Sequence, residues 1–197
     1  MPVVSIIMPS LNVVSYIEEC LQSAINQTLK DIEIICIDAG STDGTREIIN
    51  KYVLADSRIK VIDSKIKSYG YQVNLGIHEA TGEYIGILET DDFVDSEMYE
   101  QLYNIAVKHD ADYVRADYDE IFEANGKRIY NTQHIFNDIG NYNVETIAGH
   151  IPEVFVKDLN LWNGIYKKKF LDKYNIRLSE TAGAAFQDIG FKLLTLS

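Results

Sequence analysis

The sequence has 197 residues, of which 46% are hydrophobic and 24% are charged, and its formal net charge is −12 at pH 7. The length suits a single domain with a sizeable core. The negative charge excludes nucleic acid as an expected partner, because an acidic surface repels phosphate groups. The sequence has no run of 18 apolar residues and no basic lead before its first apolar run, so we expect neither a membrane span nor a signal peptide.

Through residue 118, short apolar runs alternate with segments that repeat apolar residues at helical spacing. This alternation indicates an α/β domain with a mostly parallel central sheet. We expect residues 9–12 to end the first strand, and Thr42 or Asp43 to cap a helix that ends near Ala55. The expected strands are residues 3–8, 32–37, 59–62, 84–88 and 113–118, and the other expected helices are residues 15–25, 71–80 and 96–108.

The pattern changes after Tyr118. The Asn125-Gly126 pair lies between two apolar pairs and predicts a β-hairpin. Residues 131–143 are polar and irregular, which indicates a loop. Further helices are expected at residues 170–174 and from Phe186 onward.

The two cysteines, Cys20 and Cys36, sit in apolar settings and form no Cys-x-x-Cys motif. Buried thiols of this kind are typical of a reducing compartment. We therefore expect a cytoplasmic protein, with the inner face of the membrane as a second location.

The strand at residues 84–88 is followed at once by Glu89, Asp91 and Asp92. Residues two apart in an extended chain point to the same side, so Glu89 and Asp91 can face one pocket. Like charges about 4 Å apart repel by roughly 4 kcal/mol at an effective dielectric near 20. A hard divalent cation with oxygen ligands would relieve this repulsion. The alternative is a solvated acidic turn that caps the helix beginning near Ser96.

Two further polar residues follow strand ends: Asn12 follows the first strand, and Asp38 follows the second. In parallel α/β sheets, ligands bind beyond the carboxyl ends of the strands. These two residues and the three carboxylates therefore predict a ligand site at one edge of the sheet.

Five segments of the chain match motifs in an order that is specific to one family. They are residues 3–12, an opening strand with a Pro-x-x-Asn loop; 37–44, similar to an Asp-Asp-Gly-Ser-Thr-Asp-Gly turn; 74–85, a helix leading into a strand; 89–92, in place of Asp-x-Asp-Asp; and 186–188, in place of a Glu-Asp pair. With these segments the chain resembles the family 2 glycosyltransferases, inverting enzymes of the GT-A fold.

The resemblance implies a Rossmann-like α/β/α sandwich and a role for each matching residue. Asp188 would be the general base. On the donor side, Asp38 would accept a hydrogen bond from the nucleotide base, Pro9 and Asn12 would line that pocket, Glu89 would contact the ribose or sugar, and Asp91 would hold Mn²⁺ or Mg²⁺ against the diphosphate.

The implied reaction moves a sugar, expected to be UDP-linked, from a nucleotide-sugar donor to a hydroxyl of a saccharide or lipid-linked saccharide. The cation stabilises the diphosphate leaving group, and one base deprotonates the attacking hydroxyl. A single displacement inverts the anomeric centre. The resemblance further implies a role in the synthesis of a cell-surface polysaccharide or glycoconjugate.

Four residues depart from the family pattern. Glu89 lengthens the first arm of the metal motif, and Ala39 replaces the second Asp of the turn. Val73 stands where many members carry Arg, and Gln187 leaves Asp188 as the one carboxylate of its pair. A degenerate nucleotide-sugar-binding module without turnover therefore stays open as an alternative.

Two other classes of protein share part of this pattern. A nucleotidyltransferase would carry a Gly-rich basic loop after the first strand, but residues 9–14 contain neither Gly nor Lys. A receiver domain also binds Mg²⁺ with acidic pairs, but it is shorter and lacks the segment around Asp188.

The resemblance also implies one GT-A domain over residues 1–197, with a nucleotide-sugar-binding half over about 1–120 and an acceptor-side half over about 121–197. In the family more chain follows this point, so we expect the acceptor half to be incomplete. Four apolar residues would then be exposed and favour a homo-oligomer: Phe191, Leu193, Leu194 and Leu196.

Overall fold

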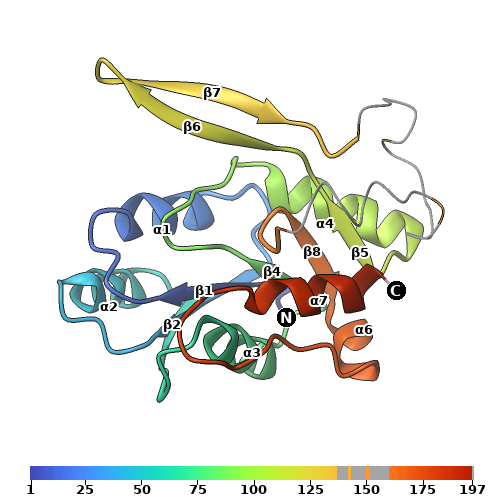
Figure 1. The fold of residues 1–197 in the computed structure, drawn as a ribbon, viewed down its shortest axis with the longest axis horizontal. Coiled ribbons are helices and arrows are strands. Elements are labelled where there is room, and N and C mark those ends of the chain that lie inside the picture. The colour runs from blue at the N-terminus through green and yellow to red at the C-terminus, as the bar shows by residue number, and fades with distance from the viewer. Residues whose placement is uncertain (137–141, 143–149, 151–159, 197) are drawn as a thin grey trace.

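A six-stranded sheet covered by helices on both faces forms the body of the protein, as a computed structural model shows for residues 1–136, 142, 150 and 160–196 (Figure 1). The strand order is β3-β2-β1-β4-β8-β5, and β8 runs antiparallel to both of its neighbours while the remaining pairs are parallel. The predicted α/β/α sandwich with a mostly parallel sheet is confirmed.

The predicted alternation of strands and helices is present along the first part of the chain. The strands are β1 (Val4–Ser10), β2 (Ile32–Asp38), β3 (Ile59–Asp63), β4 (Tyr84–Ile87), β5 (Tyr113–Arg115), β6 (Tyr118–Ala124), β7 (Lys127–Gln133) and β8 (Gly164–Lys167). The helices are α1 (Ile17–Ile25), α2 (Thr45–Ala55), α3 (Tyr69–Glu79), α4 (Met98–His109), α6 (Lys168–Lys173) and α7 (Gln187–Leu196).

Successive residues of the central strands face two separate cores. In β1, Ile6 packs with α1, α2 and α4 on one face, whereas its neighbour Ile7 packs with α3, α6 and α7 on the other. Both side chains are fully buried. A strand buried on both faces is apolar at most positions, which explains the apolar runs at residues 6–8 of β1 and 34–37 of β2.

Strand β1 continues through Pro9 to Ser10, so the prediction that Pro9 ends the strand is wrong. The Pro9 carbonyl accepts a hydrogen bond from the Thr90 hydroxyl at 2.8 Å, which places its imide nitrogen on the β4 side as well. Pairing between β1 and β4 ends at Ile7. The missing N–H therefore costs no ladder hydrogen bond, which is where a sheet tolerates proline.

The sequence did not predict β8, and it predicted a strand at residues 113–118 that is longer than β5, which ends at Arg115. Strand β8 inserts between β4 and β5 and pairs with both, with Gly86 opposite Ile165 and Val114 opposite Ile165. The chain leaves the sheet after Arg115, and β6 begins at Tyr118. Strand β8 has four residues and is followed directly by α6. So short a strand shows no recognisable period, and only pairing with distant partners defines it.

The predicted hairpin is present as β6 and β7, which extend away from the sheet in Figure 1. Asn125 and Gly126 have φ angles of 53° and 70°, the conformation that a two-residue hairpin turn requires. Arg128 ties the hairpin to α1 through two hydrogen bonds to Glu19, at 2.5 and 2.7 Å. The loop expected at residues 131–143 begins after β7, and much of it lies outside the described residues.

Helix α7 carries the four apolar residues that the sequence predicted to be exposed, and the prediction is wrong for two of them. Phe191 is fully buried and packs edge-on against Tyr166, and Leu196 is also buried. Leu193 and Leu194 are 47% and 52% exposed, as predicted. In the described part of the chain, no helix has the length and apolar character needed to cross a bilayer.

Candidate active site

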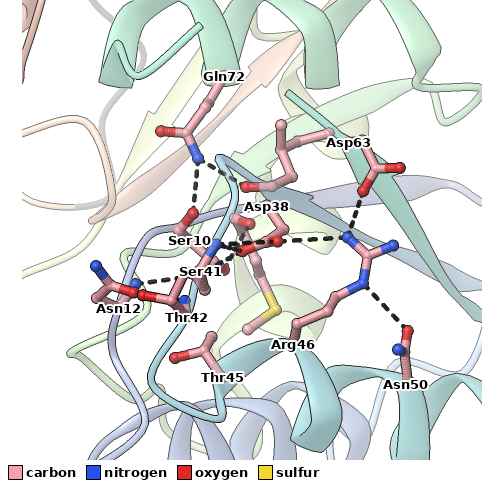
Figure 2. A network of polar contacts seen from close by, with 12 residues as sticks. Ser10, Asn12, Asp38, Ser41, Thr42, Thr45, Arg46, Asn50, Asp63 and Gln72 are labelled. Carbon is pink, nitrogen blue, oxygen red and sulfur yellow. Dashed lines mark hydrogen bonds and ion pairs between the residues drawn. The ribbon is translucent and has the colours of Figure 1, made fainter. Parts of the chain in front are cut away.

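The carboxyl ends of β1 and β2 carry a network of polar contacts around the buried Asp38 (Figure 2). Asp38 is 3% exposed. The Ser41 hydroxyl donates a hydrogen bond to its Oδ1 at 2.6 Å, and the Ser41 amide approaches the same oxygen at 3.3 Å. The guanidinium of Arg46 reaches its Oδ2 at 3.4 Å and also pairs with Asp63. Asp38 is therefore a charged acceptor that is held in place before any ligand arrives.

Asn12 links the loop after β1 to the turn after β2 (Figure 2). Its side-chain carbonyl accepts a hydrogen bond from the Thr42 amide at 2.9 Å, and its own amide donates to the Ser41 hydroxyl at 2.9 Å. Asn12 has a φ of 54°, a left-handed conformation that Asn adopts more readily than most residues. The structure thus brings together Pro9, Asn12 and Asp38, as the predicted base pocket requires.

The turn after β2 leads into α2, whose N-cap is Gly44 without a side-chain cap, so the prediction that Thr42 or Asp43 caps this helix is wrong. Asp43 instead braces the turn from the position before the N-cap. Its carboxylate accepts hydrogen bonds from the Thr45 amide at 3.0 Å and the Thr45 hydroxyl at 2.7 Å. It also accepts one from the Val14 amide at 3.0 Å. These hydrogen bonds help to fix the turn that carries Ser41 and Thr42.

A second acidic group lies after β4. One carboxylate oxygen each from Glu89, Asp91 and Asp92 lie within 4.8 Å of one another; we call these three residues the acidic cluster. Asp91 is exposed and Glu89 is half-buried. Such a set of oxygen donors fits Mn²⁺ or Mg²⁺. The family resemblance assigned the metal to Asp91, and the structure brings Asp91 together with Glu89 and Asp92, the three carboxylates that follow the strand in the sequence.

The environment of the acidic cluster favours protonation when no cation is bound. Burial raises the pKa of Glu89 to about 7, and the charges of Asp92, Asp91 and Asp188 add to this effect, while a hydrogen bond from Tyr69 opposes it. Burial and the neighbouring Asp91 raise the pKa of Asp92 to about 6. A divalent cation would compete with these protons, because it needs ionised carboxylates.

Tyr69, in the first turn of α3, is a site residue that the sequence reading did not identify. Its hydroxyl donates a hydrogen bond to Glu89 Oε1 at 2.9 Å. Burial and the charge of Glu89 raise the pKa of this hydroxyl, so it stays a donor. In the sequence Tyr69 is only a tyrosine just before the helix expected at residues 71–80, and no local pattern relates it to Glu89.

Asp188 lies in the first turn of α7 and close enough to Glu89 and Tyr69 that its charge raises the pKa of both. The structure therefore brings the expected base to the same edge of the sheet as the acidic cluster. The preceding residue, Gln187, is 1% exposed and accepts a hydrogen bond from the Gly70 amide at 2.5 Å.

The other departures from the family pattern are structural in this chain. Val73 is fully buried in the core between the sheet and α3, so it does not face the site. Ala39 is buried, and its amide donates to the Ser10 carbonyl at 3.0 Å. Two of the three consecutive lysines at 167–169 form ion pairs, Lys167 with Asp110 and Lys168 with Asp172.

Comparisons with known proteins show the family and the fold of this chain. The family model Glycosyl transferase family 2 matches residues 5–176. The glycosyltransferase GlyG of Streptococcus pneumoniae serotype 4 is 38% identical over 124 residues, which cover 62% of this chain and 41% of the relative. The putative glycosyltransferase EpsH of Bacillus subtilis is 30% identical over 178 residues, 89% of this chain and 50% of the relative. The chain thus spans half or less of the length of these relatives.

Solved structures share the fold at low sequence identity. S. aureus TarS 1–349 in complex with UDP-GlcNAc superimposes with a TM-score of 0.81 at 23% identity, over 100% of this chain and 53% of that one. The mannosyltransferase PcManGT from Pyrobaculum calidifontis, in complex with GDP-Man and Mn²⁺, gives a TM-score of 0.65 at 16% identity, over 99% of this chain and 52% of that one.

Proposed function

This chain belongs to glycosyl transferase family 2, and from that premise we propose that it moves a sugar from a UDP-linked donor to an acceptor hydroxyl, with inversion at the anomeric carbon. Its sandwich is a GT-A fold, like that of TarS. The acceptor we propose is a saccharide or lipid-linked saccharide, in the synthesis of a bacterial surface polysaccharide or glycoconjugate.

One observation carries the proposal: the ends of β1, β2 and β4 place Asp38 and the acidic cluster at the same edge of the sheet. A nucleotide sugar has a base that donates hydrogen bonds and a diphosphate that needs a cation. Asp38 supplies the acceptor, and the cluster supplies cation ligands. UDP-GlcNAc in the TarS complex, and GDP-Man with Mn²⁺ in the PcManGT complex, support this class of donor.

On the donor side, each residue has a distinct task. Ser41 and Arg46 hold Asp38, so its carboxylate accepts from the base with little reorganisation, and Pro9 and Asn12 shape the pocket around that base. Glu89 contacts the ribose or sugar. Asp91, with Asp92 beside it, would hold Mn²⁺ or Mg²⁺, which when bound neutralises the diphosphate leaving group as a Lewis acid.

On the acceptor side, we assign Asp188 as the general base. It is the carboxylate in the first turn of α7, outside the acidic cluster, so it is free of cation binding. It would take the proton of the acceptor hydroxyl as the oxygen attacks the anomeric carbon. The donor-binding half would end near residue 120, where β6 begins, and the acceptor-binding half would follow.

We further propose that the protein works in the cytoplasm. Cys20 and Cys36 are both free and buried, as suits a reducing compartment. Burial raises the pKa of both thiols, so neither is poised to react.

A thermal-shift panel tests the proposal. UDP, UDP-glucose, UDP-galactose and UDP-N-acetylglucosamine are each added with Mn²⁺ or with EDTA, and ATP and CTP represent a nucleotidyltransferase. A UDP ligand at about 100 times its Kd should raise Tm by roughly 5–10 °C with Mn²⁺. The shift should be much smaller with EDTA and in Asp38→Ala.

Two controls make the panel decisive. Asp31→Asn removes an exposed carboxylate at the opposite, amino end of the sheet, and should leave the shift unchanged. Stabilisation by ATP or CTP but by no UDP compound would contradict the proposal. Binding without any donor hydrolysis or transfer would identify a nucleotide-sugar-binding module instead of an enzyme.

A further inference from the structure

The start of α3 contacts both halves of the active site. On the donor side, the Tyr69 hydroxyl donates to Glu89 Oε1 at 2.9 Å. On the acceptor side, the Tyr69 amide donates to the Gly183 carbonyl at 2.9 Å. A single residue therefore joins a carboxylate after β4 to the segment that leads into α7, and α3 and α7 lie side by side in Figure 1.

Gln187 completes this connection from the acceptor side. Its Oε1 accepts a hydrogen bond from the Gly70 amide at 2.5 Å, and its Nε2 lies 3.4 Å from the Ser68 hydroxyl. Gln187 directly precedes Asp188. We call the four residues Ser68, Tyr69, Gly70 and Gln187 the clamp.

Packing at Gly70 leaves the clamp little freedom. A Cβ atom on Gly70 would lie 2.0 Å from the carbonyl oxygen of Ser179 and 3.0 Å from Gln187 Oε1. Only glycine allows α3 and the 179–187 segment to approach this closely. The backbone of α3 is therefore fixed against the chain that carries Asp188.

The chemistry of the clamp requires an amide at position 187. Besides Ser68, the Gln187 Nε2 group donates to the Thr181 carbonyl, to the Thr181 hydroxyl at 2.9 Å and to the Gly183 carbonyl at 3.1 Å. A glutamate has no hydrogen to donate when ionised and would place a charge among these oxygens. The neutral amide is thus suited to this chain, although the family pattern has an acid there.

We propose that Gln187 and Tyr69 are positioning residues that fix Asp188 relative to Glu89 through the clamp. The inference rests on the proposed function, because it assigns Glu89 to the donor and Asp188 to the acceptor hydroxyl. Gln187 sets the start of α7 against α3, and Tyr69 sets Glu89 against the same turn. Glu89, which contacts the donor, and Asp188, the base, are consequently held in a fixed position relative to each other.

Isosteric variants test the clamp. Gln187→Glu removes the donor groups, and Tyr69→Phe removes one hydroxyl. The probe reaction is hydrolysis of the UDP-sugar that gives the largest shift in the panel, with Mn²⁺. Gln187→Glu should lower kcat at least about tenfold, the usual size of losing a hydrogen-bonded positioning contact, with the donor KM changed less than about threefold. Tyr69→Phe should raise the donor KM and lower kcat.

The double variant measures the connection itself. Because both residues act on one turn, Tyr69→Phe should cost a much smaller factor in the Gln187→Glu background than in the wild type. Equal factors in both backgrounds would overturn the clamp, as would a Gln187→Glu variant with near-wild-type kcat. Tyr69→Phe removes only a hydroxyl, so it keeps the test valid if Gln187→Glu folds poorly.

Gln27→Glu is the matched control. Gln27 is also fully buried, donates to the carbonyls of Ser23 and Asp95 at 3.1 and 2.7 Å, and accepts from the Tyr99 amide at 3.1 Å. The same chemical change there should cost comparable stability but leave kcat within about threefold, since Gln27 follows α1 and contacts the start of α4, not α3 or α7.

Amide hydrogen exchange separates failure of the clamp from failure of the proposed function. Exchange at Gly70 should be slow in the wild type and in Gln27→Glu, and at least about tenfold faster in Gln187→Glu. If no UDP compound binds the wild type, the proposed function fails, and this exchange pattern still decides whether the clamp exists. Equal exchange in all three proteins would refute it.

Discussion

Asp38 and the acidic cluster stand at the ends of β2 and β4, the two strands that flank β1, but their charges are balanced in different ways. Asp38 is buried and receives the Ser41 hydroxyl and the Arg46 guanidinium. The cluster has Tyr69 as a donor to Glu89, and within the described ranges no Lys or Arg forms an ion pair with its three carboxylates.

The difference shows which ligand each site suits. A carboxylate already held by protein donors is a fixed acceptor for an uncharged group such as a nucleotide base. Carboxylates that repel one another, with pKa values raised to about 7 for Glu89 and about 6 for Asp92, are less stable in the ionised form than isolated carboxylates, and a cation would stabilise that form. The following predictions break or sharpen this comparison, from the largest effect to the smallest.

The largest effect should come from Asp188, which belongs to neither site. If both acidic sites serve binding, Asp188→Asn should lower turnover by about 10²–10⁴, the usual size of general-base catalysis. Its affinity for UDP with Mn²⁺, measured by calorimetry, should stay within about twofold of the wild type. A variant with near-full turnover would remove Asp188 from the mechanism.

Removing the cation should affect one site and spare the other. In EDTA, or in Asp91→Asn with Mn²⁺, the affinity for UDP should fall by roughly tenfold or more, because the diphosphate loses its counter-charge. Asp38→Ala should weaken UDP binding in Mn²⁺ and in EDTA alike. Calorimetry that gives equal affinities with and without Mn²⁺ would rule out the cation role of the cluster.

The raised pKa of Glu89 predicts a pH dependence of stability. Because its native pKa of about 7 lies above the ordinary value of 4.5, the native state binds more protons between these values, and the free energy of unfolding should fall as pH rises from about 4.5 to 7. Lys192 opposes this trend above pH 6, since burial lowers its pKa to about 6.

Glu89→Gln isolates this contribution. Urea unfolding of the variant and the wild type at pH 5 and pH 7.5, without metal, should show a larger decline for the wild type. Saturating Mn²⁺ should reduce the difference, since the cation replaces the proton on the cluster. Parallel pH profiles for the two proteins would show that Glu89 titrates normally.

The smallest effect should come from the cation that balances Asp38. Arg46→Gln removes one partner of a buried carboxylate and should lower the free energy of unfolding by about 1 kcal/mol, with UDP affinity reduced less than about fivefold. Asp63 also pairs with Arg46 but is 81% exposed on its side chain, so Asp63→Asn should cost less than about 0.5 kcal/mol. Equal losses for the two variants would contradict the distinction between buried and exposed partners.

The regular part of the fold and the donor edge could be predicted because their signals are local. Apolar runs such as residues 32–37 are buried on both faces and need no knowledge of their partners, and polar residues after them follow the rule for parallel sheets. Asn12, Asp38 and Asp91 were therefore predicted to share one edge of the sheet. Pro9 was wrongly placed outside the strand, because the end of the β1–β4 pairing cannot be seen in the sequence.

Contacts between distant segments were decided by the tertiary structure. Tyr69 and Glu89 are 20 residues apart, and Gly70 and Gln187 are 117 apart, so no local pattern relates them. Strand β8 is defined by pairing with β4 and β5, and the buried Phe191 is covered by Tyr166. The sequence alone determined the α/β class, the acidic strand end and the family resemblance, since these depend on residue type and spacing. Packing decided which groups hold the carboxylates, because a hydrogen bond depends on distance in space and not along the chain.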